Sequence, residues 1–288
     1  MDRIKNTFNF DVNSASNNIA IEIFAGIVIC LIIYVFFAII RTILNKMKNS
    51  SNDAPVIFSG LVEADKPRIA IQDPNHNNPI TLHRSKNEQG IEYTYSVWLF
   101  INGDTWGKNT DKKNSWSHVF HKGPKIKSIS KRQPDLPPHK IMDIQCPGLW
   151  ISPLDNTLRL CVNTFKTNIE YLEVNNIPIK KWILFTYTQS NFTTNIYING
   201  RLKATRNLES LPRQNYYDLY VTEHGGFSGY LSNMRYWNYV IHPTIIYDLA
   251  AKGPSLEKQI DEFSKESSEP HLNSNLPYLS NRWWVDDI

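Results

Sequence analysis

The sequence predicts a mainly β fold, a two-sheet antiparallel sandwich or jelly roll, preceded by one N-terminal transmembrane α-helix. Three observations lead to this prediction. Short apolar runs alternate with polar residues, and turn residues separate them over most of the chain. The pair Asn199-Gly200 interrupts one such run and favours a two-residue type I′ turn, because both central residues of that turn need positive φ. A continuous apolar segment, residues 19–40, stands apart near the N-terminus.

Length and composition allow one large all-β domain with appendages, or two small domains. The chain has 288 residues, of which 41% are hydrophobic, so it can form a substantial core. A net charge of +4 does not by itself indicate a nucleic-acid partner. The three cysteines, Cys30, Cys146 and Cys161, are too few for a disulfide framework. Cys146 and Cys161 could pair only if the fold brings them close, and two buried thiols are the simpler expectation.

The apolar segment 19–40 carries a single charge, Glu22. A helix of this length measures about 33 Å and can cross a hydrocarbon core of roughly 30 Å. A signal peptide or a buried core helix are the alternatives, but Arg41, Lys46 and Lys48 follow the segment as a stop-transfer flank. We therefore expect a short N-terminal segment (1–18), a transmembrane helix (19–43) and a linker (44–54). The expected anchor residues are Ile19, Phe24, Ile29, Tyr34, Phe37 and Ile40.

The flanks of this segment predict the orientation of the chain. Residues 1–18 carry Arg3 and Lys5, whereas residues 41–48 carry three cations and no anion. The positive-inside rule counts only lysine and arginine, so it places the C-terminal bulk of this single-pass protein on the cytosolic side.

Residues 55–254 are expected to form the sandwich, followed by a polar tail at 255–288. In one predicted strand Leu158, Leu160 and Val162 share a face, as period-two alternation requires. A helix is predicted at 242–254, since Pro243 suits its first turn and Gly253 suits its C-terminal cap. The predicted strands are 94–101, 117–123, 149–153, 157–163, 169–174, 182–188, 195–199 and 229–240.

A basic segment, residues 122–140, interrupts the strand pattern. It holds six lysines or arginines and four prolines, and it has no apolar period. Such a run is typical of an exposed loop, and its functional interpretation is an arm that contacts an acidic protein or anionic lipid headgroups. Nucleic acid is not expected, because no aromatic residues interleave the charges. The candidate contacts are Lys125, Lys127, Lys131 and Arg132, with Trp283 and Trp284 of the tail as a second anchor.

Several of these runs together resemble a known family. The order "YTYSVWLFING", "CPGLWISPLDNTLRLCVN", "NIYINGRL" and "GGFSGYLSNMRYW" is similar to the concanavalin A-like, laminin G-like jelly roll over roughly residues 55–254. Its marks here are Trp98, Trp182, the Asn-Gly hairpin and Gly229. More narrowly, "RSKNEQGIEYTYSVWLF" with "CPGLWISP" resembles membrane-anchored proteins encoded by large DNA viruses of algae and protists.

The resemblance implies a non-enzymatic minor capsid protein that links the internal membrane of a virion to capsid proteins. The same superfamily includes glycoside hydrolases, which need two carboxylates beside the scissile bond. Here Asp143 has only Gln145 near it, and Glu170 and Glu173 are three apart, hence on opposite faces of a strand. No catalytic residue is therefore expected.

The alternative function is a membrane-bound, lectin-like module that binds glycans. Trp106 and Trp116 in a predicted loop are its candidate sugar-stacking residues. Calcium and other metals or cofactors are not expected, since acidic residues are scattered and His118 and His121 are three apart on a strand.

Overall fold

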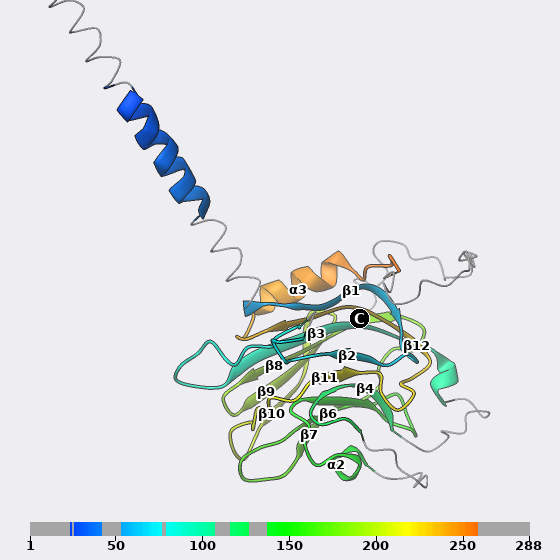
Figure 1. The fold of residues 1–288 in the computed structure, drawn as a ribbon. Coiled ribbons are helices and arrows are strands. Elements are labelled where there is room, and N and C mark those ends of the chain that lie inside the picture. Colours follow the sequence, from blue (N-terminus) through cyan, green and yellow to red (C-terminus); the bar gives the residue numbers. More distant parts are fainter. Residues whose placement is uncertain are drawn as a thin grey trace, which may run out of the picture. The chain divides into compact units, whose positions relative to one another are not determined.

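The computed structural model describes residues 24, 26–41, 53–76, 79–106, 116–126 and 137–258. The chain divides into two compact units, Met1–Ser51 and Asn52–Ile288, which are described separately (Figure 1). In the first unit residues 26–41 are helical, and their apolar side chains are exposed, including Tyr34 at 73% and Phe37 at 63%.

The predicted membrane span lies only partly within these residues. Phe24 and Ile29 are exposed and Ile40 is half-buried, whereas Ile19 lies outside the described part of the chain. Among the residues described, no helix has both the length and the apolar character needed to cross a membrane. The span therefore stays a prediction.

The second unit is a sandwich of two antiparallel sheets, which confirms the mainly β, two-sheet part of the predicted fold class (Figure 1). We call them sheet A and sheet B. Sheet A has the order β1 (Val56–Glu63), β12 (Gly229–Trp237), β3 (Glu92–Ile101), β8 (Trp182–Ser190), β9 (Thr193–Ile198) and β10 (Arg201–Asn207). Sheet B has the order β2 (Arg68–Ala70), β11 (Leu219–Val221), β4 (Ser117–Lys122), β5 (Gly148–Ile151), β6 (Leu158–Val162) and β7 (Glu170–Val174).

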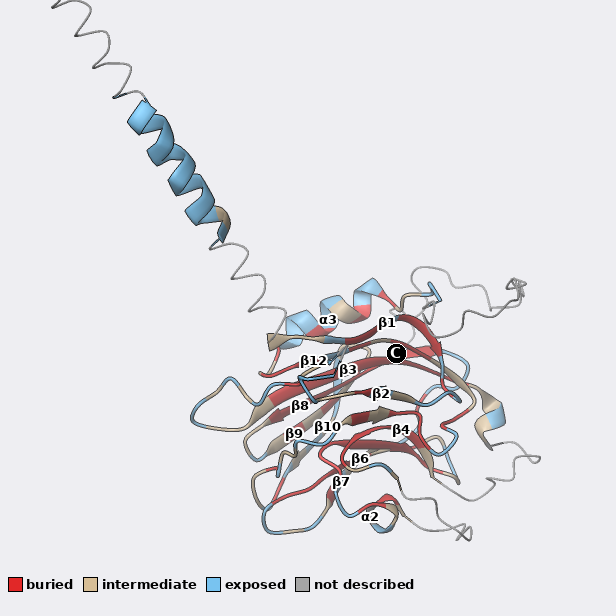
Figure 2. Ribbon diagram, in the orientation of Figure 1, coloured by how far each residue is buried: buried red, intermediate tan, exposed pale blue. Residues whose placement is uncertain are grey.

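The core lies between the two sheets, and the strands that contribute to it carry the residues coloured as buried in Figure 2. Leu99 and Phe185 of sheet A and Leu149 and Leu160 of sheet B are fully buried there. The outer face of sheet B carries a second apolar cluster, which contains Trp150 and the free thiol Cys161. The period-two alternation predicted for β6 is therefore confirmed: Leu158, Leu160 and Val162 point into the core, while Cys161 is buried on the outer face and Arg159 is half-buried there.

The described residues of this unit also form the short helices η1 (Gly103–Trp106), α2 (Pro138–Ile141) and α3 (Pro243–Lys252). Helix α3 forms where the sequence predicts it, because the His242 side chain accepts a hydrogen bond from the Thr244 N–H at its start and Gly253 ends it at φ 74°. Ala250 of α3 packs on the outer face of sheet A against a cluster that contains Trp98 and Trp182.

The hairpin between β9 and β10 confirms the predicted turn. Asn199 has φ 50° and Gly200 has φ 80°, as a type I′ turn requires. The Asn199 side chain also accepts a hydrogen bond from the Leu184 N–H at 2.8 Å, while its own N–H donates to the Leu184 carbonyl at 2.9 Å. Asn199 therefore extends the pairing of β9 with β8 by one residue beyond the end of β9.

Two sequence predictions need correction. The basic segment 122–140 is not one exposed loop: Lys122 is the last residue of β4 and is buried, and Pro138–Ile141 form α2. Strands β1, β2 and β11 were not predicted. Strand β1 contains Gly60 at φ 80° and two register irregularities, and β2 and β11 have three residues each, so none shows a clear alternation.

Candidate functional site

A cleft of about 1130 Å³ opens at the end of the sandwich where β2 and β4 end and β3 and β11 begin. Both sheets contribute to its walls, together with Phe165 and with residues from 72–74, 81–91 and 212–218. We call this feature the end cleft. Ligand sites are usually concave cavities of this kind, with both apolar and polar groups on their walls.

Tyrosines form the floor of the end cleft. Tyr93, Tyr95 and Tyr236 are buried and lie on strands of sheet A. The Tyr93 and Tyr187 hydroxyls are 2.9 Å apart, and the Tyr236 hydroxyl donates to the His83 carbonyl at 2.6 Å. Burial raises the pKa of the Tyr93 and Tyr95 hydroxyls well above the ordinary value, so these rings are neutral near pH 7.

Lys122 is the most buried of the charged residues that line the end cleft. Its side-chain Nζ donates to the Tyr217 carbonyl at 2.6 Å, and the residue is 7% exposed. Burial lowers the pKa of this amine to about 8, although the negative charge of Asp218 acts in the opposite direction. Asn215 is fixed beside it, because its amide Nδ2 donates to the Lys122 carbonyl at 2.8 Å.

The first wall is held by Gln72. Its side-chain amide donates to the Ile80 carbonyl at 2.8 Å, and its Oε1 accepts from the Leu82 N–H at 2.9 Å. The Gln72 N–H donates to Asp218 Oδ1 at 2.8 Å, which joins this wall to residues 212–218. The cleft walls are therefore fixed by side-chain to backbone hydrogen bonds rather than by strand pairing.

Exposed aromatic rings line the mouth of the end cleft. Tyr216 is 78% exposed, Phe165 68% and Tyr217 47%. A second hollow of about 460 Å³ lies beyond residues 214–217, which line both cavities. Residues 214–217 therefore form a ridge between two hollows, and Tyr216 is the most exposed aromatic side chain on it.

The candidate contacts predicted from the sequence lie elsewhere. Lys125 is exposed. Burial raises the pKa of the Glu223 carboxyl, and the positive charge of Lys125 acts in the opposite direction. Lys127, Lys131, Arg132, Trp283 and Trp284 lie outside the described residues.

Of the two loop tryptophans, Trp116 is the one whose side chain the structure describes. Trp106 ends η1, and its side chain is outside the described part of the chain. Trp116 packs on the outer face of sheet B, and the Arg159 guanidinium lies 4.2 Å from the centre of its ring. One face of that ring is therefore already occupied by a cation.

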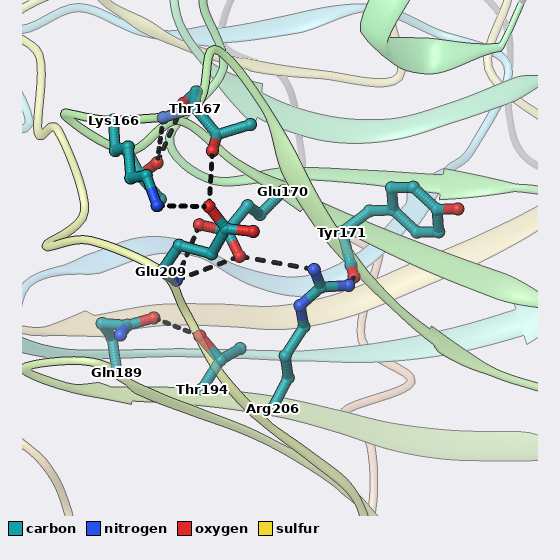
Figure 3. A network of polar contacts seen from close by, with 9 residues as sticks. Lys166, Thr167, Glu170, Tyr171, Gln189, Thr194, Arg206 and Glu209 are labelled. Atoms are coloured by element: carbon teal, nitrogen blue, oxygen red, sulfur yellow. Dashed lines mark hydrogen bonds and ion pairs between the residues drawn. The ribbon is translucent and has the colours of Figure 1, made fainter.

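Two of the carboxylates weighed for hydrolysis, Glu170 and Glu173, have structural contacts. Glu170 is 3% exposed, accepts the Glu209 N–H at 3.0 Å and pairs with Arg206 at 3.4 Å (Figure 3). Glu173, on the other face of β7, pairs with Arg159. Gln145 is buried, and it accepts a hydrogen bond from the Trp150 indole N–H at 2.7 Å.

The two histidines of β4 are in contact, so the expectation that they lie on opposite faces is wrong. A register irregularity between His118 and Phe120 turns both rings to the same side of the strand. His118 Nε2 and His121 Nδ1 are 2.7 Å apart. Burial lowers the pKa of both, to about 4 for His121. Within the described residues, no group of three or more metal-ligating side chains occurs.

Sequence reasoning did not find the end cleft. Its residues come from segments far apart in the chain, and no spacing rule connects them. One local signal was present: residues 212–217, "PRQNYY", place two adjacent tyrosines in a stretch without strand alternation.

Comparison with known proteins gives no family assignment. No family model matches the chain, and no curated protein matches it. Among solved structures, the receptor binding domain of botulinum neurotoxin D is 14% identical with a TM-score of 0.43, over 70% of this chain and 48% of that chain. The serotype G binding domain is 13% identical with a TM-score of 0.43, over 67% and 46% respectively. The receptor binding domain of the C/D mosaic serotype is 13% identical with a TM-score of 0.40, over 55% and 35%. This chain spans less than half the length of each.

Proposed function

We propose that this chain is a non-enzymatic interaction protein that holds its β-sandwich next to a membrane. The observation that carries the proposal is the helix at residues 26–41, whose large apolar side chains are mostly exposed, among them Ile32 at 63% and Phe36 at 60%. Apolar surface of this extent is costly in water, and a lipid bilayer removes that cost. The single charge in the segment 19–40, Glu22, agrees with such an environment.

Membrane association of the full chain tests the proposal. The double variant Ile29→Arg/Ile32→Arg places two cations on one face of the helix, at about 2.5–3.5 kcal/mol each in a bilayer. We expect the wild type to stay in the membrane pellet after alkaline extraction and the variant to move to the supernatant.

The matched control is Leu154→Arg/Leu202→Arg, which alters two exposed apolar residues of the sandwich, 82% and 54% exposed. It is expected to stay in the pellet. Release of the wild type by alkaline extraction would refute the proposal.

The finer assignment rests on sequence resemblance. We propose that the sandwich is a concanavalin A-like, laminin G-like jelly roll and that the protein is a minor capsid protein of a large DNA virus. Its partners would be the internal membrane and capsid proteins, with Lys125 and the rest of the basic segment as contacts on the capsid-facing side. Cross-linking in purified virions should join the chain to a capsid protein. Absence from virions, or release from them without detergent, would contradict this assignment.

A further inference from the structure

We propose that the mouth of the end cleft docks on the bilayer that anchors the chain, with Ile144, Phe165, Tyr216 and Tyr217 entering the lipid interface. We call these residues the rim. Such docking rests on the proposed membrane anchor and goes beyond it, because an anchor alone does not determine which surface of the sandwich meets the lipid.

The rim is a continuous exposed surface. Tyr216 is 78% exposed, Phe165 68%, Tyr217 47% and Ile144 38%. Both tyrosines line the end cleft and the second hollow, while Phe165 lines the first and Ile144 the second. Tyrosine is enriched where a membrane meets water, because its ring enters the apolar layer and its hydroxyl stays in water. Apolar and aromatic groups gathered on a surface in this way mark an interaction site.

The segments that carry the aromatic rings of the rim are held by hydrogen bonds. The Phe165 N–H donates to the Leu211 carbonyl at 3.1 Å, which joins the two segments. The Tyr217 N–H donates to Asn215 Oδ1 at 3.2 Å, and its carbonyl accepts the Lys122 amine at 2.6 Å. The rings therefore project from a fixed backbone, and docking requires little ordering of the chain.

The chain enters the sandwich beside the end cleft. Asp53, the first described residue after the helix, accepts the Lys86 amine at 2.6 Å, and its carbonyl accepts the Asn238 N–H at 3.0 Å. Lys86 lies within the wall segment 81–91 of the cleft. Residues 42–52 continue from Asp53 to the helix, and a segment of that length spans at most about 40 Å. The connection to the anchor therefore leaves the sandwich at the end that carries the rim.

The small size of the rim favours a bilayer over a protein partner. Its side chains are far fewer than the roughly 20–30 residues that each side of a stable protein interface contributes. A bilayer requires less, because the anchor keeps the sandwich beside it and makes docking an intramolecular step with a high effective concentration. A surface that would bind lipid weakly on its own can therefore stay docked.

The charges that line the end cleft nearly cancel. Asp73, Glu88 and Asp218 line it together with Arg84 and Lys122. Anionic headgroups and other polyanions are held by an excess of lysine and arginine, which this lining does not have. A zwitterionic lipid such as phosphatidylcholine carries no net charge and suits such a surface. Docking should therefore require no anionic lipid.

A fluorescent label on the full chain in phosphatidylcholine vesicles tests the docking. Cys30→Ser removes the exposed thiol, whereas Cys146 and Cys161 are buried. In that background Tyr216→Cys carries a nitrobenzoxadiazole label, whose ring takes the place of the tyrosine ring. Nitroxide-bearing phosphatidylcholine quenches a label that lies in the interface, so we expect the emission at position 216 to fall at least about twofold. Adding phosphatidylserine should leave the quenching unchanged.

Two matched controls separate docking from general contact with lipid. Leu154→Cys places the same label on an 82% exposed residue beyond the end of β5, away from the end of sheet B that carries Lys122, and should not be quenched. Phe165→Ser, added to the Tyr216→Cys chain, should reduce the quenching at least about twofold, because it removes an apolar rim residue. Leu202→Ser alters an exposed residue of β10 and should leave the quenching unchanged. All variants should keep the wild-type melting temperature.

The outcomes separate the docking from the anchor. Vesicle-bound protein whose label at position 216 stays in water would overturn the docking and leave the anchor in place. Equal quenching at positions 216 and 154, quenching that appears only with anionic lipid, or quenching that Phe165→Ser does not reduce would also overturn it. Protein that leaves the vesicles would refute the anchor, and the docking with it.

Discussion

The edge where β7 and β10 meet and the end cleft both place polar side chains between the two sheets, but they do so differently. At the edge, the Glu170 carboxylate is 3% exposed and receives hydrogen bonds from the Glu209 N–H and Arg206. In the end cleft, Lys122 is also buried, yet two of its N–H groups have no acceptor among the described residues. An enclosed charge that is fully paired therefore stabilises the sandwich, whereas an enclosed charge that keeps unused N–H groups lowers its stability and can bind a ligand.

The largest expected effect is at the paired edge. Glu170→Ala should lower the free energy of unfolding by about 2–4 kcal/mol, because it leaves the Glu209 N–H and part of Arg206 without an acceptor. Urea unfolding followed by tryptophan fluorescence measures it. Glu173→Ala, which removes a more exposed partner of Arg159, is the control and should cost no more than about 1 kcal/mol. Equal losses in the two variants would remove the distinction between the enclosed carboxylate of Glu170 and the more exposed carboxylate of Glu173.

The second effect concerns the paired histidines, which are enclosed on the outer face of sheet B. Burial lowers the pKa of His121 to about 4 and also lowers that of His118, so between pH 6.5 and 4 the unfolded chain binds more protons than the folded one. The stability they contribute is complete above about pH 6.5 and falls as the solution is acidified, by up to about 3 kcal/mol.

Urea midpoints at pH 7.5 and pH 5.0 test this prediction. The groups facing the pair are the Trp150 and Tyr220 rings, with His224 and Glu223 close by. His121→Gln should flatten the pH dependence. His76→Gln alters an exposed histidine outside β4 and should leave the pH dependence as in the wild type. A wild-type midpoint that does not change between the two pH values would contradict the prediction.

The smallest effect, and one of opposite sign, is expected in the end cleft. Lys122→Met keeps the side-chain volume and removes a buried charge, so the free energy of unfolding at pH 7 should stay the same or rise by up to about 1 kcal/mol. The folded pKa of about 8 lies below the ordinary 10.5, so the wild type gains stability as pH rises from 8 towards 10.5. Urea unfolding at pH 7 and pH 9.5 should show that gain in the wild type and not in the variant. A loss of more than about 1 kcal/mol at pH 7 would place Lys122 with the stabilising charges of the paired edge.

The parts of the fold that could be predicted are those that depend on local chemistry. The long strands show alternation, the Asn199-Gly200 turn has one favoured geometry, and Pro243 with Gly253 limits α3. Strands β2 and β11 could not be predicted, because three residues carry no periodicity and the pairing of these two strands with each other joins residues about 150 apart in the sequence.

The candidate site was beyond prediction for a related reason. Lys122 belongs to a run of basic residues, and only the packing of β4 separates it from that run and buries it. The contact of His118 with His121 depends on one irregular step in the pairing of β4 with β5, which residue types do not encode locally. Sequence patterns describe single elements, whereas these features arise where elements meet.

The two histidines also form a chain of hydrogen bonds that runs in one direction. The Glu223 N–H donates to His118 Nδ1 at 2.9 Å, so that nitrogen carries no proton and His118 Nε2 carries it. His118 then donates to His121 Nδ1, and His121 Nε2 donates to the Pro124 carbonyl at 3.0 Å. A backbone donor at one end and a backbone acceptor at the other leave one arrangement of protons. Both rings are thus fixed as the Nε2–H tautomer, and nitrogen NMR of the folded protein can read this directly.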